Sequence, residues 1–482
     1  MANTRAVGLI LGVVLISLAF LMLIPAIADL IAETGDWESF VLAAVITGFA
    51  GGALVLSNYT RITALGQREA FLVTTLAWTA VCVFSSLPFA LSEFEMRYVD
   101  ALFEAVSGFT TTGATVLVGL DEAPHGLLLW RSLLQWMGGL GIIVTAVAIL
   151  PFLRVGGMQL FRTESSDRSD KVLPRPSQIA RAIGEIYLLL TMLCALGYSA
   201  FGMTPFDALN HAMTTVSTAG FSTHDDSFGH FTSLGANWIA ITFMLAGGVP
   251  LILYVQTLRG MPETIWRDRQ VQAFLLFVFG ISIPLGLWVW SEGLFTGGEA
   301  ITHATFNVVS YVTTTGYSSD NFALWGPLAD MVFFLLLFTG GCTGSTSGGI
   351  KAFRYQILLL LVRSQIRQTL YPHLAQPLRY GERKVTQDVV FSIALFLFIY
   401  MCTVAILAIC LAAMGIDFIT AVSSAATAVG NVGPGIGDVV GPAGTFHPLP
   451  DAAKYLLSIG MLMGRLELLT VIVMLSRDFW ET

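Results

Sequence analysis

Long apolar runs recur along the chain, and they restrict the possible folds more than any other feature of the sequence. Each run has about 20 residues or more, which is the length that an α-helix needs to cross the hydrocarbon core of a bilayer. Ten such runs span residues 7–32, 39–58, 70–92, 127–152, 183–203, 235–257, 272–291, 329–361, 389–414 and 453–475. The sequence therefore predicts an all-α integral membrane protein.

The composition agrees with this interpretation. Of the 482 residues, 55% are hydrophobic and 12% are charged, whereas about 25% are charged in ordinary soluble domains. The first apolar run, from Ala6 to Ile24, is longer than the roughly 7–15 residues of a signal-peptide core. We therefore expect a retained helix at the N-terminus. The five cysteines include no C-x-x-C pair and suggest neither a disulfide framework nor a zinc site.

The basic residues indicate the orientation. If the N-terminus is cytoplasmic and every run crosses, 19 of the 24 lysines and arginines fall in cytoplasmic segments, and only Arg97, Arg131 and Lys454 fall in outer segments. This distribution satisfies the positive-inside rule and predicts that both termini are cytoplasmic. The outer segments are acidic and would concentrate cations, although ordinary solvated loops would give a similar balance.

A polar patch occurs four times, each time after a half-length apolar stretch. The patches read AVSGFTTTGATV (Ala105–Val116), TVSTAGFST (Thr215–Thr223), VTTTGYSS (Val312–Ser319) and AVGNVGPG (Ala428–Gly435). The preceding stretches cover residues 99–109, 206–216, 301–312 and 417–429. These stretches are too short to cross a bilayer at about 1.5 Å per residue. The sequence thus predicts four parallel units of span, re-entrant helix, polar loop and span.

Four polar loops around one axis would form an ion path. Irregular backbone at membrane depth is tolerated only where protein or a water-filled cavity satisfies its polar groups, and rings of backbone carbonyls replace the water of a small cation. Glycine suits such a loop because positive φ angles cost it little. Hydroxyl and amide groups would hold the loops open, namely those of Thr110, Thr111, Thr112, Ser217, Thr218, Thr313, Thr314, Thr315 and Asn431. Tight helix packing through small residues accounts for one such patch, but hardly for four.

The four units resemble the Trk/Ktr/HKT superfamily of potassium transporters, from about residue 70 to the C-terminus. Two further runs before the first unit make the chain more similar to the bacterial Trk membrane subunit than to the Ktr subunit. The resemblance implies potassium uptake through a selective, gated pore in the bacterial inner membrane, with potassium as substrate and no cofactor. It implies a potassium filter made of Thr111, Thr112, Gly113, Thr218, Ala219, Gly220, Thr314, Thr315, Gly316, Asn431, Val432 and Gly433. Glycine at all four filter positions favours potassium, whereas serine in the first unit is typical of sodium-conducting relatives. The fourth patch departs from the threonine-rich pattern, so we expect imperfect fourfold symmetry.

A glycine-rich segment, GGCTGSTSGGIK (Gly340–Lys351), interrupts the apolar run 329–361. Each glycine in a helix costs about 0.8–1.0 kcal/mol relative to alanine, so we expect an intramembrane loop there. The segment is neither a phosphate-binding loop nor a nucleophile elbow. The resemblance implies a gate formed by Gly340, Gly341, Gly344, Ser345, Thr346, Gly348, Gly349, Lys351 and Arg465. A broken helix at a crowded crossing is the alternative interpretation.

Arg465 lies inside the last apolar run. A charge in a span usually faces the bundle interior or water and marks an ion path. Glu467, two residues away, lies on another helix face and is a poor partner. The resemblance implies an electrostatic barrier to cations beside the pore, and a structural ion pair with another span is the alternative.

The chain divides into two N-terminal spans (1–69) and units at 70–153, 154–258, 259–362 (with the glycine-rich loop at 340–350) and 363–482. Basic segments at 154–181 and 369–384 would contact anionic lipids or a cytosolic partner. The resemblance implies a homodimer and a ring of nucleotide-binding regulatory subunits of the Trk A type, and nothing implies nucleic acid. The seven histidines show no ligand spacing, and we expect no metal site other than potassium at the filter.

The sequence bears on two other classes of function, a membrane enzyme and a coupled transporter. A membrane enzyme would need a catalytic constellation, and neither H-E-x-x-H nor G-x-S-x-G is present. A proton- or sodium-coupled transporter with alternating access is the alternative function. Such transporters more typically have inverted repeats, so four parallel units speak against this mechanism without deciding whether flux is coupled.

Overall fold

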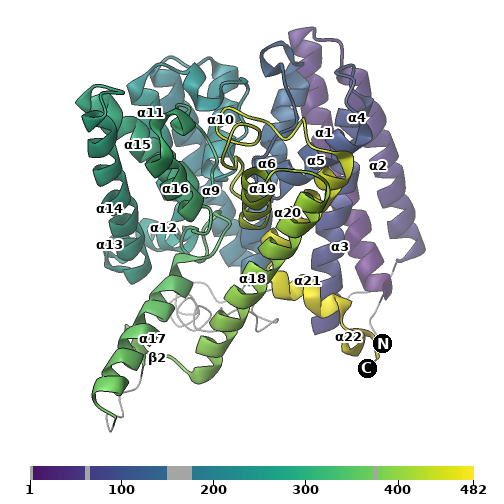
Figure 1. Ribbon diagram of the computed structural model, residues 1–482. Coiled ribbons are helices and arrows are strands. Elements are labelled where there is room, and N and C mark those ends of the chain that lie inside the picture. Colours follow the sequence, from purple (N-terminus) through teal and green to yellow (C-terminus); the bar gives the residue numbers. More distant parts are fainter. Residues whose placement is uncertain (1–3, 60–65, 149–175, 373–377, 382, 482) are drawn as a thin grey trace.

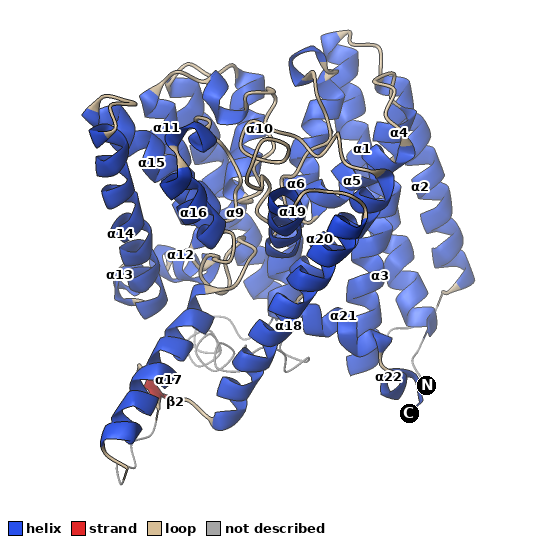
Figure 2. Ribbon diagram, in the orientation of Figure 1, coloured by secondary structure: helices blue, strands red, loops and turns tan. Residues whose placement is uncertain are grey.

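The computed structural model describes residues 4–59, 66–148, 176–372, 378–381 and 383–481. This part of the chain is almost entirely helical (Figure 2). Its one small sheet pairs β1 (Arg379–Tyr380) with β2 (Arg383–Lys384) in antiparallel register, with Arg379 opposite Lys384. The predicted all-α class is confirmed.

Helices α1 (Thr4–Ala32) and α2 (Trp37–Ser57) form a closely packed pair beside the rest of the bundle (Figure 1). Glycines permit this approach, because a Cβ added at Gly12 would lie 2.7 Å from Gly51 O, and one added at Gly51 would lie 2.8 Å from Gly12 O. Many outward side chains of this pair are large, apolar and exposed, as lipid contact requires.

The remaining helices follow the same order four times, as span, half-length helix and span. The first set is α3 (Gln67–Ser85) with α4 (Leu87–Leu91), α5 (Tyr98–Phe109) and α6 (His125–Ala148). The second is α9 (Pro176–Ala200), α10 (Pro205–Val216), α11 (Leu234–Gly248) and α12 (Leu251–Leu258). The third is α14 (Arg269–Ser291), α15 (Gly297–Val312), α16 (Pro327–Leu336) and α17 (Ala352–Leu370). The fourth is α18 (Gln387–Ala413), α19 (Phe418–Gly430), α20 (Asp451–Arg465) and α21 (Leu468–Leu475).

Short elements complete the described chain. They are the 3₁₀ helices η1 (Leu120–Glu122), η2 (Ser227–His230) and η3 (Phe322–Trp325), and the helices α13 (Glu263–Arg267) and α22 (Arg477–Glu481).

Fewer helices are continuous spans than the ten apolar runs suggested. Six described helical segments are long and apolar enough to cross a membrane, or up to eight if two bent pairs each count as one. The bent pairs are α11 with α12, at 94°, and α20 with α21, at 109°. The glycine-rich segment separates α16 from α17, so the third set also ends in a broken span.

The half-length helices α5, α10, α15 and α19 are hereafter the pore helices, and α10 and α19 lie near the middle of the view in Figure 1. Side-chain caps mark the starts of three of them, α10, α15 and α19. The Thr204 side chain accepts from Asp207 N–H and Pro205 occupies the first turn of α10, whereas Thr296 and Glu299 form a capping box at α15. Asp417 accepts from Thr420 N–H at α19, and these hydrogen bonds lower the pKa of its carboxyl. Each cap fixes where the chain turns from a full span into a pore helix.

The two chain ends lie on the same side of the bundle, away from the loops in which the pore helices begin (Figure 1). On that side, α17 and the start of α18 extend beyond the other helices, with the β1–β2 hairpin between them. The basic segment 154–181 lies mostly outside the described residues.

Candidate functional site

The four polar loops share one backbone conformation directly after the pore helices. In each loop a non-glycine residue has a positive φ, namely Thr111 (54°), Thr218 (51°), Thr314 (59°) and Asn431 (53°). Two residues later a glycine also has a positive φ, namely Gly113 (83°), Gly220 (81°), Gly316 (84°) and Gly433 (100°). The residue between them donates its N–H to the carbonyl five positions back in the pore helix, as in Thr112 to Ser107 O at 2.9 Å. These backbone bonds end each helix in a left-handed turn.

The twelve residues of these turns, hereafter the filter ring, form a closed circle. A Cβ added at Gly113, Gly220 or Gly316 would overlap with the carbonyl oxygen of Ala219, Thr315 or Val432, respectively. At Gly433 the added Cβ would lie 3.0 Å from Thr112 O, which returns to the first loop. Each loop thus packs a glycine against the middle carbonyl of the next loop, and a side chain there would push the ring apart. The fourth junction is looser than the other three.

The pore helices place negative potential at this ring. They end at Phe109, Val216, Val312 and Gly430, immediately or nearly immediately before the filter residues. The C-terminus of a helix carries roughly half a negative charge through its aligned peptide dipoles. Four such ends and a ring of backbone carbonyls form a site for a cation that has lost its water.

Side chains brace the ring at several points. The Thr110 and Thr112 hydroxyls lie 2.7 Å apart, and those of Thr313 and Thr315 lie 2.8 Å apart. Asn431 joins the ends of the circle, because its Nδ2 donates to Thr112 Oγ1 at 2.9 Å. All the filter threonines are fully buried. Most of their hydroxyls are hydrogen-bonded, whereas Thr111 Oγ1 has no hydrogen-bond partner among the described residues.

Gln135, on α6, is a support that the sequence analysis missed. Its Nε2 donates to Ala219 O at 2.9 Å, and its Oε1 accepts from Phe221 N–H at 3.0 Å. It therefore hydrogen-bonds to the second filter loop on both sides of Gly220. The signal in the sequence was a lone amide in an apolar run, which needs a buried partner.

A buried ion pair stands behind the first two loops. Arg131 Nε lies 2.8 Å from Glu104 Oε1, and the two side chains are 1% and 0% exposed. Arg131 also donates to Ser222 O at 2.7 Å, and Glu104 accepts from Val116 N–H at 3.0 Å. The sequence assigned Arg131 to an outer segment, but it lies inside α6, where it neutralises a carboxylate that would otherwise be buried alone.

Lys454 was also assigned to an outer segment and is also buried. Its Nζ lies 2.5 Å from Asp100 Oδ1, with the lysine side chain fully buried. Arg97 bridges the same aspartate to Asp451 at the edge of this contact. The pair joins α5 of the first set to α20 of the fourth. The first and fourth sets are therefore connected by an ion pair as well as by their filter loops.

The glycine-rich loop, residues 340–351, is packed against the filter ring. Gly348 N–H donates to Thr314 Oγ1 at 2.7 Å, and the hydroxyls of Thr346 and Thr218 lie 3.1 Å apart. Gly344 and Gly349 have φ angles of 85° and 66°. The chain is therefore non-helical here, as predicted, and it lies directly against the positive-φ residues of the second and third filter loops.

The break between α11 and α12 provides the hydrogen bonds that this loop needs. Cys342 N–H donates to Gly248 O at 2.9 Å, Thr346 N–H donates to Gly247 O at 3.1 Å, and Leu251 N–H donates to Gly344 O at 3.1 Å. The two broken spans thus form hydrogen bonds with each other's backbone N–H and carbonyl groups. The apolar run 235–257 predicted a continuous span, although G-G-V-P at 247–250 signals a break.

Arg465 lies beside the loop at the second unpredicted break. Its side chain is buried and its Nη2 donates to Thr346 O at 3.0 Å, whereas Nε and Nη1 have no hydrogen-bond partner among the described residues. A small cavity is lined by Arg465, Lys351, Glu467 and the glycine-rich loop. A buried guanidinium next to a cavity makes the local electrostatic potential positive, which opposes the entry of cations.

Glu467 has a partner after all, on another element. Because α20 ends at Arg465 and Glu467 has a φ of 63°, its carboxylate turns to Arg354 Nη2 on α17, at 2.7 Å. Arg354 also stacks on Phe396, with its guanidinium carbon 3.6 Å from the ring centroid. The continuous helix assumed from the sequence would have directed Glu467 elsewhere.

Comparisons with known proteins agree along the whole chain. The family model described as "TrkH: Cation transport protein" matches residues 37–290 and 292–481. The Trk system potassium uptake protein TrkI of Halomonas elongata is 46% identical over 98% of this chain and 96% of its own length. The Trk system potassium uptake protein TrkH of Escherichia coli is 36% identical over 99% of both chains.

A solved structure has the same fold. The crystal structure of the potassium transporter TrkH from Vibrio parahaemolyticus superposes with a TM-score of 0.92 at 34% identity, covering 99% of this chain and all of that one. The chain belongs to the TrkH family of cation transport proteins.

Proposed function

We propose that this chain carries potassium into the cell across the bacterial inner membrane, through a gated pore that the filter ring lines. The observation that carries the proposal is the closed circle of four backbone turns, in which each glycine lies against the middle carbonyl of the next loop. The family is one of transport proteins rather than enzymes, and relatives are named as potassium uptake proteins.

Potassium suits this ring because its ligands are backbone oxygens rather than charged side chains. Carbonyls at the ends of four pore helices offer partial negative charge without binding the ion so strongly that it stays. No residue of the filter ring has a charged side chain. Potassium is the substrate here, and the mechanism needs no cofactor.

The glycine-rich loop and Arg465 form the proposed gate. In support, the loop hydrogen-bonds to two filter loops, and Arg465 hydrogen-bonds to the loop. Displacement of the loop would move Thr346 and Gly348 away from the ring together. Flux would then depend on the hydrogen bonds to the α11–α12 break, which hold the loop in place.

The orientation and partners follow from charge and resemblance. We place both termini in the cytoplasm, because basic residues are concentrated in the segments on their side. The protruding α17–α18 hairpin, with Arg379 and Lys384 in its small sheet, is the surface that we assign to a nucleotide-binding regulatory ring of the Trk A type. Exposed apolar side chains elsewhere fit lipids and a second copy of the chain in a homodimer.

The experiment compares potassium, rubidium and sodium flux into liposomes for the wild type and Gly113→Ser. Gly119→Ser is the matched control, since both glycines have a φ of 83° but nothing lies within 4 Å of an added Cβ at Gly119. We expect Gly113→Ser to lower potassium-over-sodium discrimination at least about tenfold, roughly 1.4 kcal/mol, with little change in the control. Equal potassium and sodium flux in the wild type, unchanged by Gly113→Ser, would overturn the filter assignment.

A further inference from the structure

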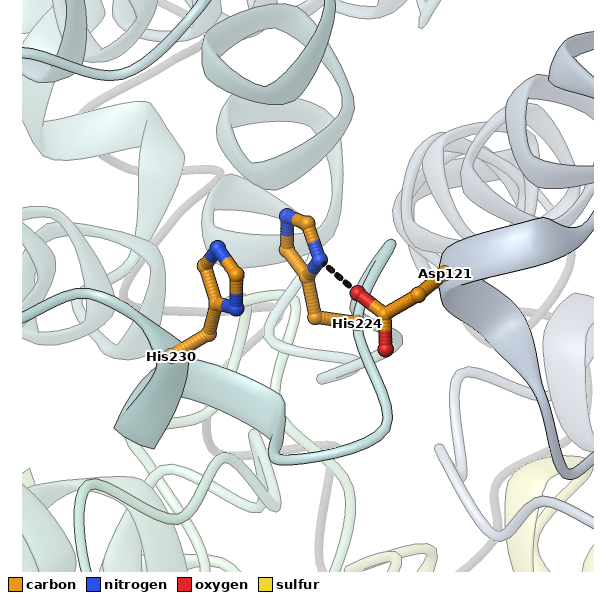
Figure 3. Close-up of side chains that lie close together, drawn as sticks. All are labelled: Asp121, His224 and His230. Atoms are coloured by element: carbon orange, nitrogen blue, oxygen red, sulfur yellow. Dashed lines mark hydrogen bonds and ion pairs between the residues drawn. The ribbon is translucent and has the colours of Figure 1, made fainter.

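A cluster of possible metal ligands lies outside the filter ring. It consists of Asp121, His224 and His230, shown in Figure 3, and one ligand atom from each lies within 4.8 Å of the others. The sequence analysis found no ligand spacing among the histidines. The fold brings Asp121 and His224 together, although they are 103 residues apart in sequence.

The cluster is held by the segments that leave the first two filter loops. Asp121 belongs to η1, eight residues after Gly113, and His224 follows Gly220 by four residues. Asp225 fastens these segments together, because its carboxylate accepts from the N–H groups of Gly119 and Leu120 at 2.9–3.1 Å. The backbone around the cluster is therefore fixed from both sides.

The side chains already contact one another. His224 Nδ1 lies 2.5 Å from Asp121 Oδ1, and the rings of His224 and His230 are stacked, with centroids 3.5 Å apart and planes at 3°. On the other edge of the His224 ring, Nε2 is buried, has no hydrogen-bond partner and lies 3.6 Å from Asp207 Oδ1. A small approach of this carboxylate would let it accept the Nε2 proton and leave Nδ1 as a ligand, which is a common arrangement behind metal-bound histidines.

From this geometry we propose that Asp121, His224 and His230 bind one divalent transition-metal ion, of the zinc class. Two imidazoles and one carboxylate are typical of zinc sites that keep a position for water. We do not expect potassium to bind to these side chains, because imidazole nitrogen is a preferred ligand of transition metals. The site is thus chemically distinct from the filter ring. That it faces the outside of the cell rests on the proposed function, whereas its ability to bind metal does not.

Binding requires a small rearrangement, and His230 is free to make it. Zinc lies about 2.0–2.1 Å from imidazole nitrogen and in the plane of the ring, so the two stacked rings must splay. His230 is exposed and ends the short helix η2. Asp121 is also half exposed. His224 is mostly buried and can remain in place as the anchor.

The test measures Zn²⁺ binding calorimetrically to the purified, tag-free full chain, with Co²⁺ absorption as a second probe of coordination. His230→Gln is the main variant, because an exposed side chain can be replaced without unfolding the protein, and Asp121→Asn is the second. His447→Gln is the matched control, an exposed histidine outside the cluster. We expect one ion per chain, at least about tenfold weaker binding in both cluster variants, and unchanged binding in the control.

Three results would overturn the proposal. They are no Zn²⁺ binding by the wild type, wild-type affinity in His230→Gln, or an equal loss in His447→Gln. Each is read without ion flux, so a failure of the metal site is distinguished from a failure of the potassium pore.

Discussion

Asn431 differs from its three counterparts in the filter ring, all of which are threonines. Asparagine tolerates the left-handed conformation better than most residues, and its Nδ2 donates both to Thr112 Oγ1 and to Met461 O, at 2.9 and 3.0 Å. It therefore compensates for the looser packing at Gly433. The fourth loop is held to the first by a side chain where the others rely on backbone contact.

Replacing Asn431 tests this compensation. We expect Asn431→Ala to lower potassium-over-sodium discrimination in liposome flux and to destabilise the protein by about 1–3 kcal/mol, because buried acceptors lose their donor. Asn431→Gly is the informative companion, since it keeps the left-handed backbone but removes the amide. Wild-type discrimination in both variants would mean that the amide bonds do not matter.

The buried pair of Glu104 and Arg131 is a second residue-scale test. Arg131→Met leaves a buried carboxylate without its partner, and we expect a loss of about 3–5 kcal/mol in the free energy of unfolding. Arg181→Met is the control, because the Arg181–Glu185 pair is exposed and such pairs contribute about 0–1 kcal/mol. Denaturant unfolding in detergent measures both. Similar losses in the two variants would contradict the assignment.

At the scale of elements, the sequence predicts the pore helices well and the broken spans poorly. The four half-length stretches agree with α5, α10, α15 and α19 to within about four residues at each end, because capping residues and glycines mark them locally. The break at 340–351 was also predicted, from its glycines. The break after Arg465 was not, because contacts with Arg354 and Thr346, distant in sequence, produce it.

The candidate site divides in the same way. The positions of the filter glycines could be read from the repeated patches, since a positive φ leaves a compositional signal. The roles of Gln135, Arg131 and Lys454 could not, because each depends on which buried group lies opposite on another element. Apolar periodicity locates a helix without identifying the partners of its polar residues.

The glycine-rich loop offers an element-scale prediction. A Cβ at Gly348 would lie 2.7 Å from Gly430 O and 3.0 Å from Asn431 Cβ, so Gly348→Ala pushes the loop away from the filter ring. We expect open probability in single-channel recordings to rise several-fold. Gly280→Ala is the control, a helical glycine with nothing within 4 Å of an added Cβ. Unchanged gating in Gly348→Ala would remove the loop from the proposed gate.

For the whole molecule, the contact of Asp100 with Lys454 is the seam between the first and fourth helix sets. We expect Lys454→Met to destabilise the protein by about 3–5 kcal/mol, because Asp100 is buried and keeps only the exposed Arg97 as a partner. Arg97→Met should cost far less, because the Arg97 side chain is exposed and its ion pairs are screened by water. Thermal unfolding in detergent measures the loss of stability in both variants. A larger loss in Arg97→Met than in Lys454→Met would contradict the assignment of this contact as the seam.

The closed circle also sets the order in which this protein can be made. Asn431 and Thr112 are 319 residues apart, so the first filter loop leaves the ribosome long before its last neighbour exists. Until the fourth loop is synthesised, the first and third loops each lack one neighbour, and an incomplete chain has no closed ring. The ring of this pore can therefore close only after the fourth filter loop has been synthesised, so every shorter nascent chain lacks a complete filter.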